Sequence, residues 1–316
     1  MVLAVRAASL RIGYEEDHGV VWVVDKIDLS IKPGMIYCIA GESGCGKTTL
    51  GNVLSGVLPP HGVVDGILEV FGRNVVRGNY IDYNGLRGKI VSRIPQNPGL
   101  ALSPYLSIGE QIADVLKVHH RIDDKRLLKE KSMELLKLVN LPSSILDYYP
   151  HELSGGMQQR AAIALAIASK PRLIVADEPT SSLDASLRSQ ILGLLVKLRR
   201  ELGVTIVLIT HDLYTARYVC DRVAIMYAGE IIEEASTEEL YRNPLHPYTR
   251  LLLESIPVIG VDKELHGIEG SPPEPGSYPR GCRFHPRCPY RMGRCSQVEP
   301  PMYSNGDRIV KCWLYG

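Results

Sequence analysis

GESGCGKTT at residues 41–49 decides the fold of this 316-residue chain. The segment fits the pattern G-x-x-x-x-G-K-[ST], follows the apolar run MIYCIA at 35–40 and opens a predicted helix at 47–57. In this context glycines let backbone N–H groups turn around phosphate oxygens, and the helix adds its positive dipole end. The sequence therefore predicts a phosphate-binding loop between a strand and a helix.

The side chains of this loop predict a nucleotide together with its metal ion. Lys47 would bring a positive charge to the β- and γ-phosphates, and the Thr48 hydroxyl would ligate Mg²⁺. ATP and Mg²⁺ are therefore the expected cofactors. The predicted contacts of the loop are Gly41, Ser43, Gly44, Cys45, Gly46, Lys47, Thr48 and Thr49.

A second element, LIVADE at 173–178, is an apolar strand that ends in two acids. Ligands of open parallel sheets bind at the carboxyl edge of the strands, so Asp177 is placed to hold Mg²⁺ through its water shell. Glu178 follows directly, and a carboxylate there would orient and deprotonate an attacking water. Beside a phosphate-binding loop, these two acids predict a hydrolytic site rather than a solvated turn.

Apolar patterns on both sides of these motifs predict an α/β fold. Alternating segments at 3–12, 21–31 and 66–72 indicate an antiparallel sheet near the N-terminus. Short apolar runs indicate a mainly parallel sheet with strands at 35–40, 89–94, 173–177, 204–210 and 222–228. Helices are predicted at 47–57, 110–119, 125–139, 155–169, 185–202 and 212–220. The long helical stretch between the second and third parallel strands predicts a helical subdomain at about 97–168.

Composition excludes several classes of protein. Hydrophobic residues make up 45% and charged residues 22% of the chain, which is typical of a globular protein. The 36 basic residues nearly balance the 35 acidic ones. The sequence therefore has no excess of positive charge that would predict a nucleic-acid partner. No apolar run approaches about 18 residues, and the N-terminus lacks the pattern of a signal peptide. We therefore expect the protein in the cytosol or at the cytoplasmic face of the membrane.

The order of further motifs resembles one family. LSGGMQQR at 153–160 places a serine and two glycines before an amphipathic helix. The phosphate loop, Gln96, LSGGMQQ, LIVADEPTSSLD and His211 follow each other as in ABC transporter ATPases, over residues 1–235. This resemblance implies a P-loop NTPase ABC cassette, with a RecA-like parallel sheet core, an antiparallel β subdomain and a helical subdomain.

The resemblance also implies roles for single residues. Ser154, Gly155 and Gly156 would contact the γ-phosphate of the nucleotide on a partner subunit, and Asp184 would cross the same dimer interface. Gln96 would ligate Mg²⁺ near the attacking water, and His211 would hydrogen-bond the γ-phosphate. Tyr14 would stack on the adenine. The implied catalytic residues are Glu178, His211 and Gln96.

An ABC cassette acts with partners. A second cassette would close the nucleotide site and exclude water. The expected complex holds a second homologous ATPase, as a heterodimer with a homodimer as the alternative, two transmembrane permeases and an extracytoplasmic solute-binding protein. The expected docking surface for the permeases is the helical insert, including residues 97–114.

The C-terminal region resembles that of the oligopeptide/dipeptide importer branch, through NPLHPYTRLLLESIP at 243–257 and GCRFHPRCPYRMGRC at 281–295. Spacing alone leaves the four cysteines there open as zinc ligands, [4Fe–4S] ligands, disulfides or free thiols. The resemblance favours a [4Fe–4S] cluster with a structural role. The expected metal ligands are Cys282, Cys288, Cys295 and Cys312. His285 is expected to be a loop residue, and Cys38, Cys45 and Cys220 to be small buried residues.

These expectations give a domain layout and several open alternatives. The ATPase domain would span 1–235, a connector 236–270 and the metal-binding region with its four cysteines 271–316. The expected function is ATP hydrolysis that energises oligopeptide or dipeptide import. An oligosaccharide or nickel importer of the same branch stays open, because the ATPase subunit does not touch the solute. A soluble non-transport ABC ATPase and a catalytically weak regulatory subunit are further alternatives.

Overall fold

The computed structural model describes residues 2–256 and 267–316. It divides into two compact units, one formed by residues 1–82 with 209–316 and the other by residues 83–208. Within the described ranges, no helix is both long and apolar enough to cross a membrane.

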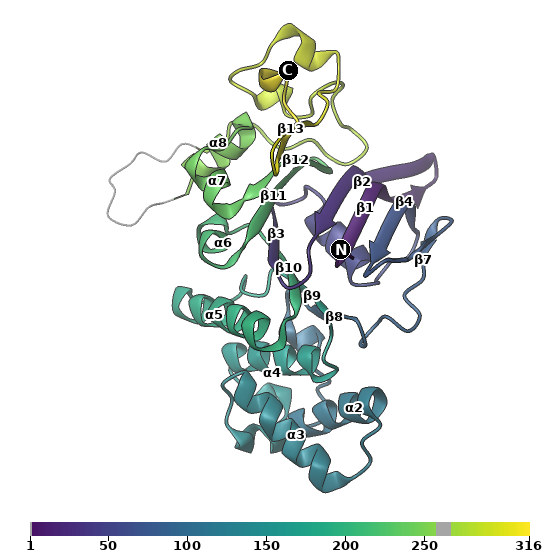
Figure 1. The fold of residues 1–316 in the computed structure, drawn as a ribbon, viewed down its shortest axis with the longest axis vertical. Helices are drawn as coiled ribbons and strands as arrows, with labels where there is room; N and C mark the ends of the chain where they lie inside the picture. Colours follow the sequence, from purple (N-terminus) through teal and green to yellow (C-terminus); the bar gives the residue numbers. More distant parts are fainter. Residues whose placement is uncertain (1, 257–266) are drawn as a thin grey trace. The chain divides into compact units, whose positions relative to one another are not determined.

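The first unit begins with the antiparallel sheet that the sequence predicted (Figure 1). Its strands lie in the order β2-β1-β4-β5. Alternation of apolar and polar residues explains the pairing, since one face of each long strand is buried. The strands are β1 (Val5–Glu16), β2 (Gly19–Ile31), β4 (Gly62–Val70) and β5 (Arg73–Asn74), and a small hairpin adds β6 (Val76–Arg77) and β7 (Tyr80–Ile81).

A second, mixed sheet in this unit has the strand order β13-β14-β12-β11-β3. Strand β3 (Ile36–Ala40) runs parallel to β11 (Arg222–Tyr227), which confirms the predicted parallel pairing. The remaining strands are antiparallel additions: β12 (Glu230–Ser236), β14 (Arg308–Val310) and β13 (Tyr303–Asn305). The sequence did not predict these three strands.

The helices of this unit confirm part of the prediction and add to it. Helix α1 (Lys47–Leu54) ends three residues before the predicted end, and α6 (Leu213–Val219) lies within its predicted range. Helices α7 (Thr237–Arg242) and α8 (Pro247–Glu254) were not predicted. The described C-terminal residues from 267 onward contain only short 3-10 turns as helical structure, namely η4 (His285–Arg287), η5 (Gly293–Ser296) and η6 (Trp313–Tyr315).

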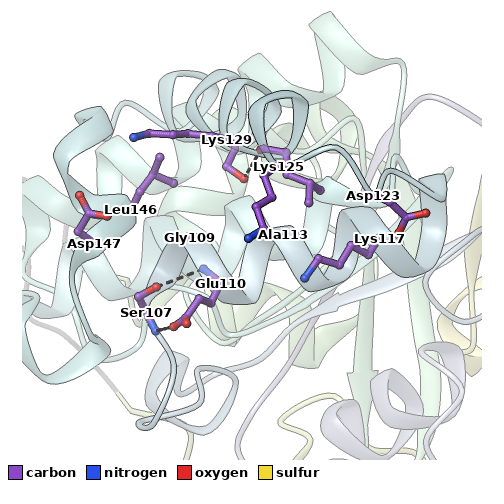
Figure 2. A pocket seen from close by; sticks show the side chains of 12 residues that line it. Ser107, Gly109, Glu110, Ala113, Lys117, Asp123, Lys125, Lys129, Leu146 and Asp147 are labelled. Carbon is purple, nitrogen blue, oxygen red and sulfur yellow. Dashed lines mark hydrogen bonds between the residues drawn. The ribbon is translucent and has the colours of Figure 1, made fainter.

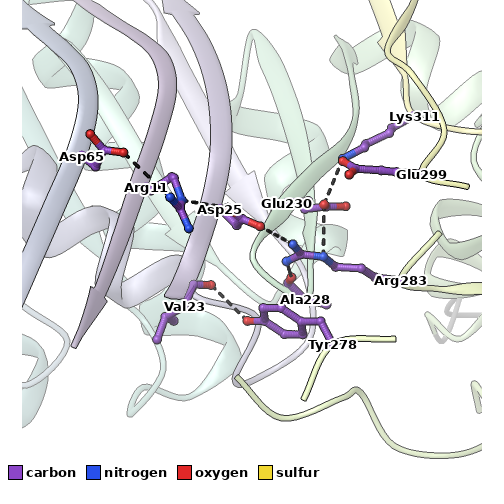
Figure 3. A network of polar contacts seen from close by, with 10 residues as sticks. All are labelled: Arg11, Val23, Asp25, Asp65, Ala228, Glu230, Tyr278, Arg283, Glu299 and Lys311. Atoms are coloured by element: carbon purple, nitrogen blue, oxygen red, sulfur yellow. Dashed lines mark hydrogen bonds and ion pairs between the residues drawn. The ribbon is translucent and has the colours of Figure 1, made fainter. Parts of the chain in front are cut away.

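Residues 267–316, called the C-terminal segment below, are held against the rest of the first unit by ion pairs and hydrogen bonds (Figure 3). The Arg283 guanidinium contacts Asp25 of β2 at 2.5 Å and Glu230 of β12 at 3.1 Å, and it donates to the Ala228 carbonyl. Lys311 makes a second contact to Glu230, at 2.9 Å. Because Asp25 lies in one sheet of the unit and Glu230 in the other, the C-terminal segment contacts both sheets.

The second unit contains the helical insert. Strand β8 (Val91–Ile94) runs parallel to β9 (Leu173–Asp177), and the four main helices agree with the predicted ranges to within two residues at either end. Strand β10 (Thr205–Thr210) starts in this unit and ends in the first. The helices are α2 (Ile108–His120), α3 (Lys125–Leu138), α4 (Gly155–Ala168) and α5 (Ala185–Leu202), with 3-10 turns η1 (Pro98–Leu100), η2 (Ser143–Asp147) and η3 (Pro150–Glu152).

The predicted domain ranges 1–235, 236–270 and 271–316 stay a prediction. The two compact units have different boundaries from these predicted domains, because residues 209–316 form one unit with residues 1–82. Residues 257–266 of the predicted connector lie outside the described residues.

Candidate functional site

The phosphate loop lies where the sequence predicted it, between the fully buried strand β3 and helix α1. Two of its glycines are required, Gly41 by a close approach of β11 and Gly46 by its own left-handed backbone conformation. A Cβ at Gly41 would lie 2.1 Å from the Met226 carbonyl oxygen, and one at Gly46, whose φ is 102°, would lie 2.9 Å from the Met226 side chain. The loop therefore keeps its path only with glycine at these positions.

Lys47 is buried inside this loop, with 5% of its surface exposed. Its ammonium donates to the Gly41 carbonyl at 2.8 Å and to the Glu42 carbonyl at 2.7 Å. Gly46 is the N-cap of α1 and, as a glycine, has no side chain that could accept a hydrogen bond from the first turn of the helix. An ammonium and the positive end of a helix dipole in one loop provide the environment that a phosphate group needs.

The other predicted loop contacts have distinct environments. Ser43, Gly44 and Thr48 are exposed, whereas Cys45 is buried and its burial raises the pKa of the thiol. Thr49 is half-buried on α1.

Two more predicted residues belong to the same unit. Tyr14 is half-buried on β1, opposite Val21 of β2. His211 is exposed just after β10. Their predicted contacts with adenine and the γ-phosphate stay predictions.

In the second unit, the structure brings the two predicted acids into contact with neighbouring polar residues. Asp177 ends β9 with 1% of its surface exposed, and Arg93 of β8 contacts its carboxylate at 3.0 Å. The Gln96 side-chain amide donates to the Glu178 carboxylate at 3.2 Å. Glu178 has a φ of 42°, a left-handed conformation that is unfavourable for a residue with a side chain. Such backbone strain occurs often at functional sites and supports a special role for this carboxylate.

The role of Arg93 was not predicted from the sequence. Its signal was a single arginine in the apolar strand run KIVSRI, at a position where a buried strand normally has an apolar side chain. The structure shows that this arginine neutralises Asp177 across neighbouring parallel strands. A Mg²⁺ ion bound near Asp177 would therefore compete with the guanidinium for the same carboxylate.

The glycine-rich signature also forms a helix start. Ser154 caps α4, and its hydroxyl accepts a hydrogen bond from the Met157 amide. A Cβ at Gly155 would meet open space, so this glycine leaves the backbone accessible. Asp184 caps α5 by accepting from the Leu187 amide at 2.9 Å. Asp184 therefore has a local structural role, whatever it does at an interface.

The cysteines separate into two groups. Cys282, Cys288, Cys295 and Cys312 are free thiols that line one cavity, together with His246 and Phe284. Burial, and then the charges of the neighbouring cysteines, raise the pKa of Cys282 to about 12. Cys38 and Cys220 were expected to be isolated buried residues. Both are buried, but they are paired in a disulfide, which the distance of 182 residues between them concealed.

Two models of protein families match the sequence. The model described as "ABC transporter" matches residues 24–181. The model described as "Oligopeptide/dipeptide transporter, C-terminal region" matches residues 232–295, which include three of the four C-terminal cysteines.

Curated relatives are similar over nearly the full length. The chain is 40% identical to the oligopeptide transport ATP-binding protein AppD of Bacillus subtilis (strain 168), covering 92% of this chain and 90% of the relative. It is 36% identical to the oligopeptide transport ATP-binding protein OppD of Escherichia coli (strain K12), covering 96% and 91%. Among solved structures, the dimeric post-hydrolysis state of the ATP-binding cassette MJ0796 with ADP and Pi matches with a TM-score of 0.65 and 29% identity, covering 74% of this chain and 98% of that chain.

Replacing Lys47 by methionine should weaken nucleotide binding by roughly tenfold or more, because the charge at the centre of the loop is lost. Equilibrium titration with a fluorescent ATP analogue in the presence of Mg²⁺ measures the effect. Lys32→Met, at an exposed position of the same unit, is the matched control and should bind like the wild type. Unchanged affinity in Lys47→Met would show that this loop is not the nucleotide site.

Proposed function

Since this chain belongs to the family of ATP-binding subunits of oligopeptide and dipeptide ABC transporters, we propose that it performs this ATPase role with the residues described above. It is an ABC-type ATPase that energises peptide import. The observation that supports the residue assignment best is the buried Lys47 ammonium, enclosed by a glycine loop at the start of helix α1. We place the protein at the cytoplasmic face of the membrane, bound to its permeases.

In this proposal each residue acts on a defined part of MgATP. The loop amides and Lys47 hold the β- and γ-phosphates. Thr48 and Gln96 ligate Mg²⁺, Asp177 holds it through water, and Tyr14 stacks on the adenine. His211 hydrogen-bonds the γ-phosphate.

Glu178 is the proposed general base. Its carboxylate would accept a proton from the water that attacks the γ-phosphate, and the Gln96 amide would hold it in position. The 3.2 Å hydrogen bond between Gln96 and Glu178 supports this pairing, because it fixes a carboxylate that backbone strain already constrains.

A second cassette completes the proposed site. Ser154, Gly155 and Gly156 of each subunit would bind the γ-phosphate held by the other, through the uncovered backbone at the start of α4. The dimeric form of the solved cassette MJ0796 supports this arrangement by analogy. ATP would then join the two cassettes, and its hydrolysis would let them separate and move the attached permeases.

Glu178→Gln should abolish turnover, with a fall of at least about a hundredfold, because glutamine keeps the shape of the side chain but cannot accept the proton. The variant should still bind MgATP, accumulate as an ATP-dependent dimer and fail to support uptake of labelled peptide. Phosphate release, size-exclusion chromatography and uptake assays test these outcomes. Glu201→Gln, exposed on α5, is the control. Full steady-state hydrolysis by Glu178→Gln would contradict its role as the base.

The permeases would dock on the helical insert. The second unit contains an open pocket of about 360 Å³ between the start of α2 and helix α3 (Figure 2). Three lysines, at 117, 125 and 129, and acids that include Glu110 and Asp123 line it. A pocket of this size and mixed charge has room for a few side chains, and we propose that charged side chains of both signs on a permease helix enter it. Part of the predicted docking segment 97–114 forms its wall.

Ala113→Arg should fill this pocket and prevent co-purification of the permeases from membranes, while nucleotide binding by the isolated subunit is retained. Val118→Arg, at a 72% exposed position of the same helix outside the pocket, should co-purify with them like the wild type. Retention of the permeases by Ala113→Arg would exclude this surface as the docking site.

The wild-type complex purified in the same way also identifies the solute. Its solute-binding protein is tested for binding of peptides, oligosaccharides and nickel. The ATPase subunits found in the complex show whether the dimer contains one or two different chains.

The four C-terminal cysteines are the proposed ligands of a metal centre. All four thiols line one cavity, which supports a shared centre, although no three His, Cys, Asp or Glu side chains of the described ranges are arranged as ligands of one ion. A zinc ion would bind four thiolates directly, and a [4Fe–4S] cluster would bind one thiolate at each of its four iron atoms. Because the C-terminal region resembles that of the oligopeptide/dipeptide importer branch, we propose the cluster, with zinc as the alternative.

A buried histidine supports this assignment. His246 lines the same cavity, its Nδ1 accepts from the Tyr248 amide, and its Nε2 finds no hydrogen-bond partner among the described residues. Burial lowers the pKa of His246 to about 3, so the ring is neutral and Nε2 bears the hydrogen. An N–H donor left over in a cavity of thiols suits a sulfur acceptor. The cluster would cross-link a segment that has few apolar contacts of its own.

Protein purified without oxygen should contain about four iron and four sulfide per chain and absorb in the visible range. Cys295→Ser should lose most of the iron and unfold at a lower temperature, because one of four ligands is gone. The neighbouring exposed change Ser296→Ala should keep the iron. Zinc without iron would favour the alternative ion, and absence of both metals would contradict a metal centre.

A further inference from the structure

The C-terminal segment, which contains the four cysteines, contacts the phosphate loop directly through an ion pair. Arg287, one residue before Cys288, donates to both carboxylate oxygens of Glu42, at 2.7 and 3.0 Å. Glu42 is the second residue of the phosphate loop. The Arg287 side chain is 6% exposed and that of Glu42 24%, so this two-pronged ion pair is largely withdrawn from water.

The Arg287 guanidinium is held from every side. Its Nε donates to the Glu269 carbonyl at 2.8 Å, and Nη2 also donates to the Ile268 carbonyl at 3.2 Å. Nη1 lies 3.4 Å from the Tyr227 hydroxyl. The guanidinium therefore has a fixed position, and the carboxylate bound to it is fixed with it.

On the loop side, Glu42 is anchored through all its polar groups. Its amide donates to the Tyr248 hydroxyl at 2.9 Å, and its carbonyl accepts from Lys47 at 2.7 Å. One residue therefore connects Arg287 to the ammonium that holds the nucleotide phosphates. A shift of Glu42 would move an acceptor of Lys47 and would bring an unpaired negative charge towards the triphosphate.

On the other side, the same short segment contains candidate cluster ligands. Phe284, with 1% of its surface exposed, packs on Tyr227 and Tyr248 at ring distances of 5.2 and 5.3 Å. Cys282 precedes this aromatic anchor and Cys288 follows Arg287. Cys288 therefore follows Arg287 directly, and Cys282 lies two residues before Phe284, so the cavity and the contact with the loop are close in sequence.

We propose that Arg287 is a positioning residue for nucleotide binding: it holds Glu42 in place and neutralises its charge, so that an intact cysteine segment is required for full affinity. This inference rests on the proposed use of residues 41–49 as the nucleotide site. It gives the C-terminal segment a role in the ATPase cycle beyond its own stability, because loss of the segment's fold would loosen the loop.

Arg287→Met tests the proposal in the full-length protein, with affinity for a fluorescent ATP analogue as the readout. We expect binding roughly tenfold weaker than in the wild type. Arg291→Met, exposed in the same segment, is the matched control and should bind normally. In a Glu42→Gln background the Arg287→Met change should cost at most about twofold, because no carboxylate is left to neutralise. A purely structural role of Arg287 would leave the loss unchanged in that background and would overturn the electrostatic part of the proposal.

Two further measurements distinguish a local effect of Arg287→Met from unfolding of the C-terminal segment. Iron content and thermal unfolding report whether the segment stays folded in Arg287→Met. Should it unfold, Arg287→Lys replaces it, since lysine retains the charge but not the two-pronged contact, and weaker binding with normal iron content supports the proposal. Normal affinity in a folded Arg287→Met protein overturns it. Failure of the wild type to bind nucleotide would instead overturn the proposed function.

Discussion

A glycine loop can bind phosphate only while the amides that face the ligand stay available, and much of the structure of the first unit follows from this constraint. The backbone contact within the loop, from the Cys45 amide to the Glu42 carbonyl, is long at 3.5 Å, and Gly46 has no capping side chain, so neighbours help to hold the loop. Strand β11 approaches so closely that only glycine fits at 41, the Lys47 ammonium binds two loop carbonyls, and Arg287 and Tyr248 hold Glu42 from outside. Of these contacts, the one with Tyr248 uses a loop amide, that of Glu42, and the others leave the amides available for a ligand.

Much of this arrangement could be predicted from sequence because its signals are local. A phosphate loop, an acidic strand end and a glycine-rich helix start each occupy a few consecutive residues, and their chemistry follows from residue type and spacing. The three long strands of the antiparallel sheet were predicted to within four residues at each end and the four main helices of the second unit to within two. Helix α4 was nevertheless expected to be amphipathic, whereas it is buried on nearly every side. Alternating strands such as β1 and β2, 12 and 13 residues long, leave little ambiguity about which face is buried.

The features that sequence did not reveal are those that join distant segments. Strands β13 and β14 have three residues each, too few for a periodic pattern, and are defined by pairing with β12, which lies far earlier in the chain. Arg93, the disulfide of Cys38 with Cys220 and the Arg287–Glu42 pair likewise depend on which strands and turns become neighbours. Charged residues in such places look like ordinary surface residues until the fold supplies their partners.

The pairing of β14 with β12 has a consequence for the behaviour of the whole chain. Without β14, the second strand of the hairpin β11–β12 would be the outer edge of the sheet, with a row of unpaired backbone groups open to another molecule. Strand β12 is almost entirely buried, and its Glu233 relies on Arg308 of β14 for charge balance. A chain that ends before this strand would expose the unpaired backbone groups of β12 and would leave the Glu233 carboxylate without its guanidinium partner, with only the Leu245 and His246 amides, among the contacts described for it, still donating to it. By covering the edge of β12, strand β14 therefore prevents pairing between copies of the chain, and chains that lack β14 should aggregate.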